Sequence, residues 1–368
     1  MMTIQKEYPF YLKVTVILFG LCLAAGFLFI LGDILVPFAF AILFAILLNP
    51  LCTWLQRKKV HKVFAVILTL LVAIVALGSI LYFLSTQIAQ FGQELPLLKL
   101  KFASLLNGLE LFIQQQFGIT MAKQSALMKQ AVNSSPALIG QTLGAVVGSL
   151  SLVVIIPVYV FLMLYYKTLI LNFLYEVFKE QHSQRVSEIL KETKTAIQSY
   201  VTGLLIEMII VSSLNSVALM ILGVKYAILL GVVGGILNML PYIGGIIAIA
   251  LPVIIATITK DGYTTQLGIV IAYLVIQFID NNIIFPRFVS IKVQINALVS
   301  IVVILLGNAL WGVSGMFLSI PFIAVLKIIF DRIEDLKPWG KLFGDAVPVR
   351  HMGQVWGRRK KSSSVGVS

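Results

Sequence analysis

Two acidic residues stand inside long apolar stretches of the 368-residue sequence, where ionisable side chains are rare. Glu207 and Asp280 are both flanked by Leu, Ile, Val and other apolar residues. Placing a carboxylate at the centre of a membrane helix costs about 2.5–3.5 kcal/mol on insertion scales, so such a group usually has a function. The two carboxyl groups are candidate ligands for a polar solute, a cation or a proton. For Glu207 the alternative is a solvated position near the end of its helix.

Amide side chains accompany Asp280. Gln277, Asp280 and Asn281 share one helical face because they are three and four residues apart. Asn282 follows directly, and Pro286 comes shortly afterwards. This group could coordinate a cation or a proton, or hydrogen-bond a polyhydroxylated solute. The alternative is ordinary hydrogen bonding between packed helices, which this concentration of polar groups exceeds.

Glycine and proline interrupt two other apolar stretches. In transporters, discontinuous helices direct freed backbone groups and helix ends at the substrate. The segment from Asn238 to Gly245 is therefore a predicted site element, with Asn238, Pro241, Tyr242, Gly244 and Gly245 as its candidate residues. Helix breaks are predicted at Gly312, Gly315 and Pro321. Close helix packing through small residues is the alternative for some of these glycines.

Membrane helices must position these residues. The sequence is 59% hydrophobic and only 12% charged, whereas about a quarter of the residues in soluble domains are charged. About 20 apolar residues are needed to span a bilayer. Eight stretches approach that length: 12–30, 34–48, 63–84, 143–166, 201–222, 226–258, 267–285 and 297–330. The predicted fold is all-α, a polytopic integral membrane protein with some discontinuous helices in its C-terminal half.

The order of these stretches predicts six regions. They are three N-terminal spans (1–84), an amphipathic helical insertion outside the cytoplasm (85–140), a fourth span (141–166), a cytoplasmic linking helix (167–200), a C-terminal transport region of four spans (201–335) and a basic cytoplasmic tail (336–368). Placing both termini in the cytoplasm puts 21 of the 28 Lys and Arg residues on that side. Such an excess is typical of cytoplasmic loops.

The insertion carries a seam of apolar residues at alternating gaps of three and four, from Ile88 to Phe112. The seam could associate with another copy or cover a pathway. The alternative is a helix that lies on the membrane surface or on its own spans, which is favoured by Pro96 within the seam and by the lack of paired charges.

Several classes of function are excluded. Cys22 and Cys52 provide neither a disulfide framework nor metal-ligand spacing, and the three His residues lie in polar stretches. No nucleophile motif, phosphate-binding loop or catalytic carboxylate pair is present. The basic residues lie at the ends of apolar stretches, which membrane topology explains without a nucleic-acid partner. We expect no enzyme activity, no cofactor, no metal site and no nucleic acid.

The chain resembles the autoinducer-2 exporter family over nearly its whole length. The resemblance rests on Leu48-Asn49-Pro50, Gln87 to Pro96, Leu222 to Tyr226, Pro241 to Gly244, Gln277 to Pro286, Gly312, Gly315 and Ile320-Pro321. It implies eight spans in a bacterial inner membrane, secondary transport or facilitated export, and a homo-oligomer. Some members are linked to export of the signal autoinducer-2 and others to sodium/proton antiport.

Three positions depart from the family pattern. Asp280 stands where the family usually has Glu. Gly245 stands where the family often has Pro after the Gly of the sixth span, and Ile295-Asn296-Ala297 replaces a stretch that contains His. The missing His removes a titratable group. Three hypotheses therefore remain: export of a small polar solute such as autoinducer-2, sodium (or lithium)/proton antiport through Asp280 and Glu207, and a membrane scaffold that transports nothing.

Overall fold

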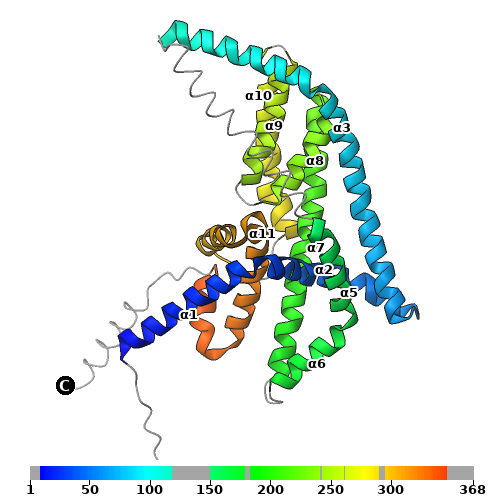
Figure 1. The fold of residues 1–368 in the computed structure, drawn as a ribbon, viewed down its shortest axis with the longest axis vertical. Helices are drawn as coiled ribbons and strands as arrows, with labels where there is room; N and C mark the ends of the chain where they lie inside the picture. The colour runs from blue at the N-terminus through cyan, green and yellow to red at the C-terminus, as the bar shows by residue number, and fades with distance from the viewer. Residues whose placement is uncertain are drawn as a thin grey trace, which may run out of the picture.

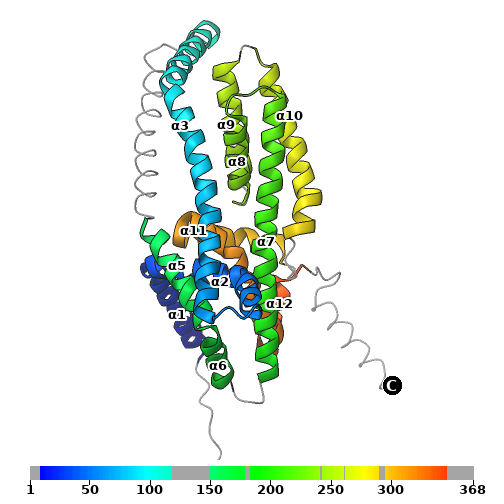
Figure 2. The same ribbon diagram turned by 90° about the vertical axis from the view of Figure 1, so that its right-hand side faces the viewer.

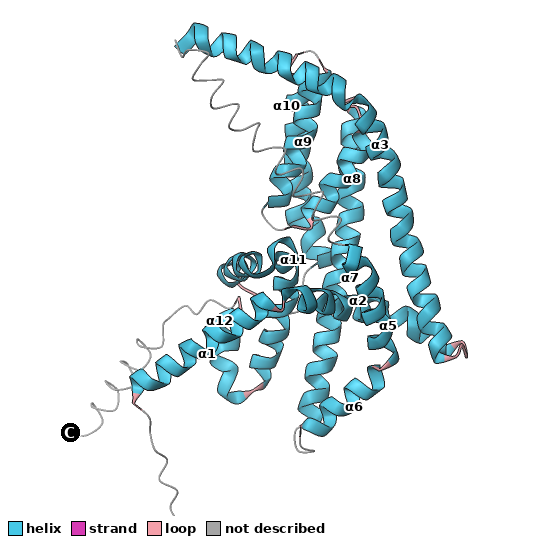
Figure 3. Cartoon of the chain, in the orientation of Figure 1, coloured by secondary structure: helices cyan, strands magenta, loops and turns pink. Residues whose placement is uncertain are grey.

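Helices make up every regular element of the described residues, as Figure 3 shows. The computed structural model describes residues 9–117, 150–178, 183–240, 243–260, 262–289 and 295–345. Within these ranges six helical segments are long and apolar enough to cross a membrane. They are α1 (Phe10–Ile30), α2 (Gly32–Arg57), the first part of α3, α7, α10 with the element that follows it, and α11. The predicted all-helical, polytopic membrane protein is confirmed.

The N-terminal helices form a small bundle of their own. The helices α1 and α2 make a tight hairpin, and α2 packs with α3 (Lys62–Phe117) and α5 (Leu150–Tyr165) around Cys52, Val66 and Val160. Apolar side chains of α1 are exposed along its length. A helix that is apolar on all sides but little covered by protein is suited to contact with lipid tails.

Two of the predicted boundaries fall inside continuous helices. The third predicted span and the start of the insertion are one 56-residue helix, α3, which bends near the upper end of the molecule in Figure 1. Its Phe91 ring lies 5.2 Å from that of Tyr226. The later part of the insertion, residues 118–140, and the first residues of the predicted fourth span, 141–149, lie outside the described residues. Likewise the linking helix and the fifth span are joined in α7 (Ser183–Ile221), after α5 turns by 64° into α6 (Lys167–Val177).

The stretch expected as the sixth span is a helical hairpin. The helices α8 (Ala227–Asn238) and α9 (Ile243–Thr259) lie side by side, as Figure 2 shows. With 12 and 17 residues they extend about 18 and 26 Å, less than the roughly 30 Å hydrocarbon core. Both ends of the hairpin lie at one end of the bundle, where a Cβ at Gly223 would be 3.2 Å from Nζ of Lys260. The count of 21 cytoplasmic Lys and Arg residues includes Lys260 and leaves Lys225 on the other side, whereas the structure brings Lys260 beside Gly223.

The last long helix also folds back on itself. In α11 (Ala297–Arg332) the backbone leaves helical geometry at Trp311 and Gly312, and Gly312 has φ +58°. After this break the Ser319 hydroxyl donates to the Val303 carbonyl oxygen over 2.9 Å, so the two halves run back along each other. The predicted position Gly315 packs against Gly307 across this hairpin. Pro321, in contrast, lies within continuous helix and does not break it.

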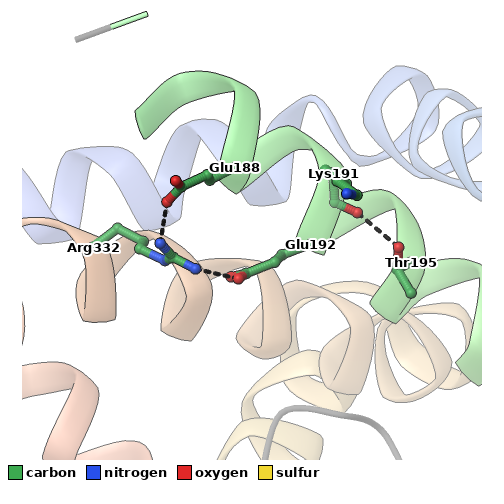
Figure 4. Close-up of polar contacts among 5 residues, drawn as sticks. All are labelled: Glu188, Lys191, Glu192, Thr195 and Arg332. Atoms are coloured by element: carbon green, nitrogen blue, oxygen red, sulfur yellow. Dashed lines mark hydrogen bonds and ion pairs between the residues drawn. The ribbon is translucent and has the colours of Figure 1, made fainter. Parts of the chain in front are cut away.

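An ionic contact joins the end of α11 to the start of α7. The Arg332 guanidinium donates to the carboxylates of Glu188 and Glu192, one turn apart on α7 (Figure 4). The chain then continues through a 3₁₀ turn (Glu334–Leu336) into α12 (Lys337–Phe343). Asn296, at the start of α11, donates its side-chain amide to the carbonyl oxygens of Leu342 and Gly344. Both ends of α11 are therefore held at the same end of the molecule.

Candidate functional site

A cavity of about 780 Å³ lies where α7, the tip of the α8–α9 hairpin, the end of α10 and the start of α11 meet. Its polar lining consists of Tyr200, Glu207, Asn238, Gln277, Asp280, Asn281 and Ser300. Five of these seven belong to the residues singled out from the sequence, and they come from three separate helices. Apolar side chains such as Leu204, Ile249 and Ile304 complete the wall.

The two carboxyl groups share one hydrogen-bond donor. Nδ2 of Asn238 donates to Oε1 of Glu207 over 3.1 Å and to Oδ2 of Asp280 over 2.9 Å. Both acidic side chains are buried, at 4% and 3% exposure. Oε2 of Glu207 and Oδ1 of Asp280 have no hydrogen-bond partner among the described residues. Each carboxyl group thus keeps one buried oxygen atom without a hydrogen-bond donor among the described residues.

Gln277 and Asn281 extend the acidic pair into an amide ladder. Nε2 of Gln277 donates to Oδ1 of Asn281 over 3.3 Å and lies 3.5 Å from Oδ2 of Asp280. Asn282 behaves differently, because it is exposed, donates to the Phe278 carbonyl oxygen of its own helix and does not line the cavity. Pro286 is also exposed and away from the lining.

The helix that carries Asp280 changes its geometry at that residue. The helix α10 (Thr264–Ile279) is followed by a ten-residue π-helical element, η2 (Asp280–Val289), which contains Pro286. A long π-helical stretch is rare, and π-helical turns are often found at functional sites. The close approach of η2 to α7 requires Gly203, because a Cβ there would overlap the Phe288 carbonyl group. The crossing positions Asp280 beside Glu207.

The tip of the α8–α9 hairpin supplies the third side of the site. Asn238, Met239, Leu240 and Gly245 line the cavity. Gly244 lacks a Cβ where the tip reverses, and one would overlap the Leu237 carbonyl oxygen. Pro241 and Tyr242 lie outside the described residues. Irregular backbone at membrane depth is tolerated only where protein or a water-filled space surrounds it, and the described residues Asn238 to Leu240 border the cavity.

Small residues hold the hairpin against α7. A Cβ at Gly231 or Gly235 would overlap Ser216 or Ser212, and one at Gly234 would lie 3.1 Å from Nδ2 of Asn215. Close backbone approach through glycine and serine is the usual way in which membrane helices associate. This packing brings Asn238 near enough to reach Glu207.

Three residues of the site were not predicted from the sequence: Tyr200, Ser300 and Asn296. Tyr200 and Ser300 line the cavity. Asn296 caps α11 by accepting from the Val299 backbone N–H over 2.9 Å, which fixes the position of Ser300. Asn directly before a helical stretch is a recognisable N-cap signal. Tyr200 and Ser300 carry no comparable signal, because single hydroxyl side chains are common in membrane helices.

The arrangement can bind a small, neutral or cationic ligand with hydroxyl or ammonium groups. The carboxyl oxygens accept, the amides of Gln277 and Asn281 both donate and accept, and apolar side chains line the rest of the wall. An anion would meet two buried carboxyl groups and is disfavoured. The described residues contain no cluster of three His, Cys, Asp or Glu side chains that could hold a metal ion.

Helices broken at a buried polar cavity, within a polytopic membrane protein, are typical of secondary transporters. The sequence profile of the AI-2E family transporters matches residues 16–335, and the chain belongs to this family. It is therefore of a transporter class and not an enzyme.

Proteins similar to the chain span most of its length. The AI-2 transport protein TqsA of Escherichia coli (strain K12) is 26% identical over 82% of this chain and 86% of its own. YrrI of Bacillus subtilis (strain 168) is 24% identical over 82% and 87% of the two chains. PerM of Escherichia coli (strain K12) is 27% identical over 85% and 92%.

Proposed function

We propose that the protein exports a small, hydroxyl-rich solute such as autoinducer-2 through the cavity between the hairpin tip and Asp280. The observation that carries the proposal is the convergence of Glu207, Asn238, Gln277, Asp280 and Asn281 on one cavity from three helices. Its volume lies in the range of small-molecule sites, about 300–1,000 Å³. Similarity to a protein named for autoinducer-2 transport supports this solute class.

Sodium/proton antiport is the second candidate. It is favoured by the two buried carboxyl groups that share the Asn238 amide and each keep an oxygen without a partner among the described residues. Such a pair could exchange a proton for a sodium ion. The cavity is much larger than a sodium ion needs, which is why we place the organic solute first.

The membrane topology also forms part of the proposal. Both termini lie in the cytoplasm of a bacterial cell, and residues 201–335 form the transport region. Because the α8–α9 hairpin does not cross the membrane, this topology places Lys260 on the outer side. It places Arg287, beyond α10, on the cytoplasmic side. The excess of Lys and Arg beside the termini is retained. A homo-oligomer, as the family resemblance implies, would be tested by cross-linking in the membrane.

Transport by the purified full-length protein in proteoliposomes tests this function. Vesicles loaded with autoinducer-2 should release it faster than vesicles without protein, and Asp280→Asn should slow the release by about tenfold to a hundredfold, the equivalent of losing a charge-assisted hydrogen bond of 1.5–3 kcal/mol. The matched control is Asp33→Asn, because Asp33 is exposed at the α1–α2 turn. Equal release by Asp280→Asn and wild type would refute the proposed site.

The same vesicles distinguish the second candidate. A pH-sensitive dye inside them reports proton movement when sodium chloride is added outside. Sodium-dependent proton movement that Asp280→Asn abolishes, without release of autoinducer-2, would favour antiport. Neither activity in well-folded protein would favour the scaffold hypothesis instead.

A further inference from the structure

Three buried polar side chains outside the cavity lie along the seam between α7 and α10. Asn215 on α7, and Tyr273 and Gln266 on α10, are each at least nine-tenths buried. Oδ1 of Asn215, the Tyr273 hydroxyl and Oε1 of Gln266 have no hydrogen-bond partner among the described residues. Leaving such a group unsatisfied costs about 1–3 kcal/mol, so three together require partners from outside this part of the chain.

The three side chains are arranged in line with the carboxyl pair. Gln266, Tyr273 and Asp280 are seven residues apart, on one buried face of α10 and its continuation. Successive members are about 10.5 Å apart along the helix axis. On α7, Asn215 follows Glu207 by about two turns and stays on the buried side.

Asn215 and Tyr273 meet at a glycine. A Cβ at Gly234 would lie 3.1 Å from Nδ2 of Asn215 and 3.6 Å from the Tyr273 hydroxyl oxygen. Glycine at this position lets the α8 backbone approach both polar groups closely. The two levels of polar groups are separated by Val211 and Ile276, which pack together with Ile284 in an apolar cluster.

We propose that the α7–α10 seam is a water site, in which ordered water molecules bridge Asn215, Tyr273 and Gln266. Water suits these groups because all three are neutral, and each can accept as well as donate. Buried water molecules typically make about three hydrogen bonds to polar groups that the protein leaves unsatisfied. A charged ligand would find no opposite charge among these three side chains.

The water site gives the carboxyl pair a second approach, from the end of the membrane at which α10 begins. Val211 and Ile276 form an apolar neck that closes this approach in the present conformation. When the neck opens, protons or a small hydrated cation can reach Asp280 without entering the solute cavity. This role rests on the proposed function of the carboxyl pair, whereas the water site itself does not.

Silver-ion accessibility tests the water site without any transported solute. Silver ions react with thiols and pass through water-filled paths too narrow for organic reagents. The native thiols at Cys22 and Cys52 are first removed by Cys→Ser substitutions. Thiols introduced by Gln266→Cys or Tyr273→Cys should then be blocked several-fold faster than one introduced by Ala256→Cys, measured in membrane vesicles by later maleimide labelling of the denatured protein.

Ala256 is the matched control because it is fully buried in the same apolar cluster as Tyr273. Blocking should occur from one side only, when right-side-out and everted vesicles are compared. Equal rates at positions 273 and 256 overturn the proposal. If the wild-type protein does not transport autoinducer-2 but the introduced thiols still react with silver, only the proposed function is disproved.

Thermal unfolding of Tyr273→Phe gives an independent test if the Cys variants do not fold. This substitution removes only the hydroxyl group. If water satisfies that hydroxyl, the melting temperature in detergent should stay the same or fall. If the seam is dry, removing an unsatisfied polar group should raise the melting temperature, and a rise overturns the proposal.

Discussion

Glu207 and Asp280, 73 residues apart in the sequence, accept hydrogen bonds from the same nitrogen atom, Nδ2 of Asn238. That amide has no further hydrogen to donate, so one buried oxygen of each acid is left without a donor among the described residues. Two acidic groups held together with incomplete hydrogen bonding are a source of instability, which a binding site can tolerate because its ligand supplies the missing partner.

The first prediction is therefore that Glu207→Gln stabilises the protein while impairing transport. The amide of Gln can donate to Oδ1 of Asp280, an oxygen that lacks a partner among the described residues, and this should raise the free energy of unfolding by about 1 kcal/mol. Thermal unfolding in detergent and release of autoinducer-2 from proteoliposomes measure the two effects. A lower melting temperature with unchanged transport would show that Glu207 serves only to hold Asn238.

The second prediction concerns the α7–α8 contact. Gly235→Val should destabilise the protein by about 1–3 kcal/mol, because the added side chain would overlap the Ser212 side chain and push the hairpin away from α7. Gly78→Val on α3 is the matched control, since nothing lies within 4 Å of a Cβ at that position. Yield and melting temperature of the two purified variants measure the difference. If both variants behave alike, α8 does not pack against α7 as closely as the structure shows.

The residues of the site could be found from the sequence because burial of polar groups leaves a compositional signal. Asp280, Gln277, Asn281 and Glu207 stand out against apolar surroundings, and all four line the cavity. Asn238 was found through its Gly- and Pro-rich neighbourhood. Asn282 has the same residue type and neighbourhood as Asn281 but points elsewhere, since successive side chains leave a helix in different directions.

The path of the chain was less predictable, because hydropathy measures apolar length and not direction. Residues 226–258 and 297–330 are each long enough for one crossing, yet each contains two helices that run back along each other. The reversal depends on contacts that are distant in sequence, such as Gly235 with Ser212. The boundaries predicted after residue 84 and before residue 201 lie inside α3 and α7, because a change from apolar to amphipathic sequence does not by itself end a helix.

The third prediction concerns the reversal in α11. Gly312 has φ +58° and ψ −141°, close to a region that is nearly restricted to glycine, so Gly312→Ala should destabilise the protein by about 1–3 kcal/mol. Nothing lies within 4 Å of a Cβ at this position, so backbone strain is the only cause. Gly20→Ala, also with nothing within 4 Å, is the control. Comparable melting temperatures for both variants would argue that α11 does not reverse at Gly312.

The fourth prediction concerns the ionic contact between α7 and α11, two helices that both line the cavity. Arg332 pairs with Glu188 and Glu192, but all three side chains are more than a third exposed, so screening by water and salt limits their contribution. Arg332→Gln should lower the free energy of unfolding by no more than about 1 kcal/mol. Because the contact fixes one helix relative to the other, we expect a larger effect on the rate of solute release than on stability.

A charge reversal separates the ionic contact from simple loss of packing. Arg332→Glu should impair release more than Arg332→Gln, since it places like charges together, and adding Glu188→Arg should restore part of the rate. Lys337→Gln, which breaks only the exposed pair with Glu334, is the control and should release autoinducer-2 at the wild-type rate. High salt should reduce the difference between Arg332→Gln and wild type, because it screens exposed charges. An unchanged rate in every Arg332 variant would mean that this ionic contact does not control solute release.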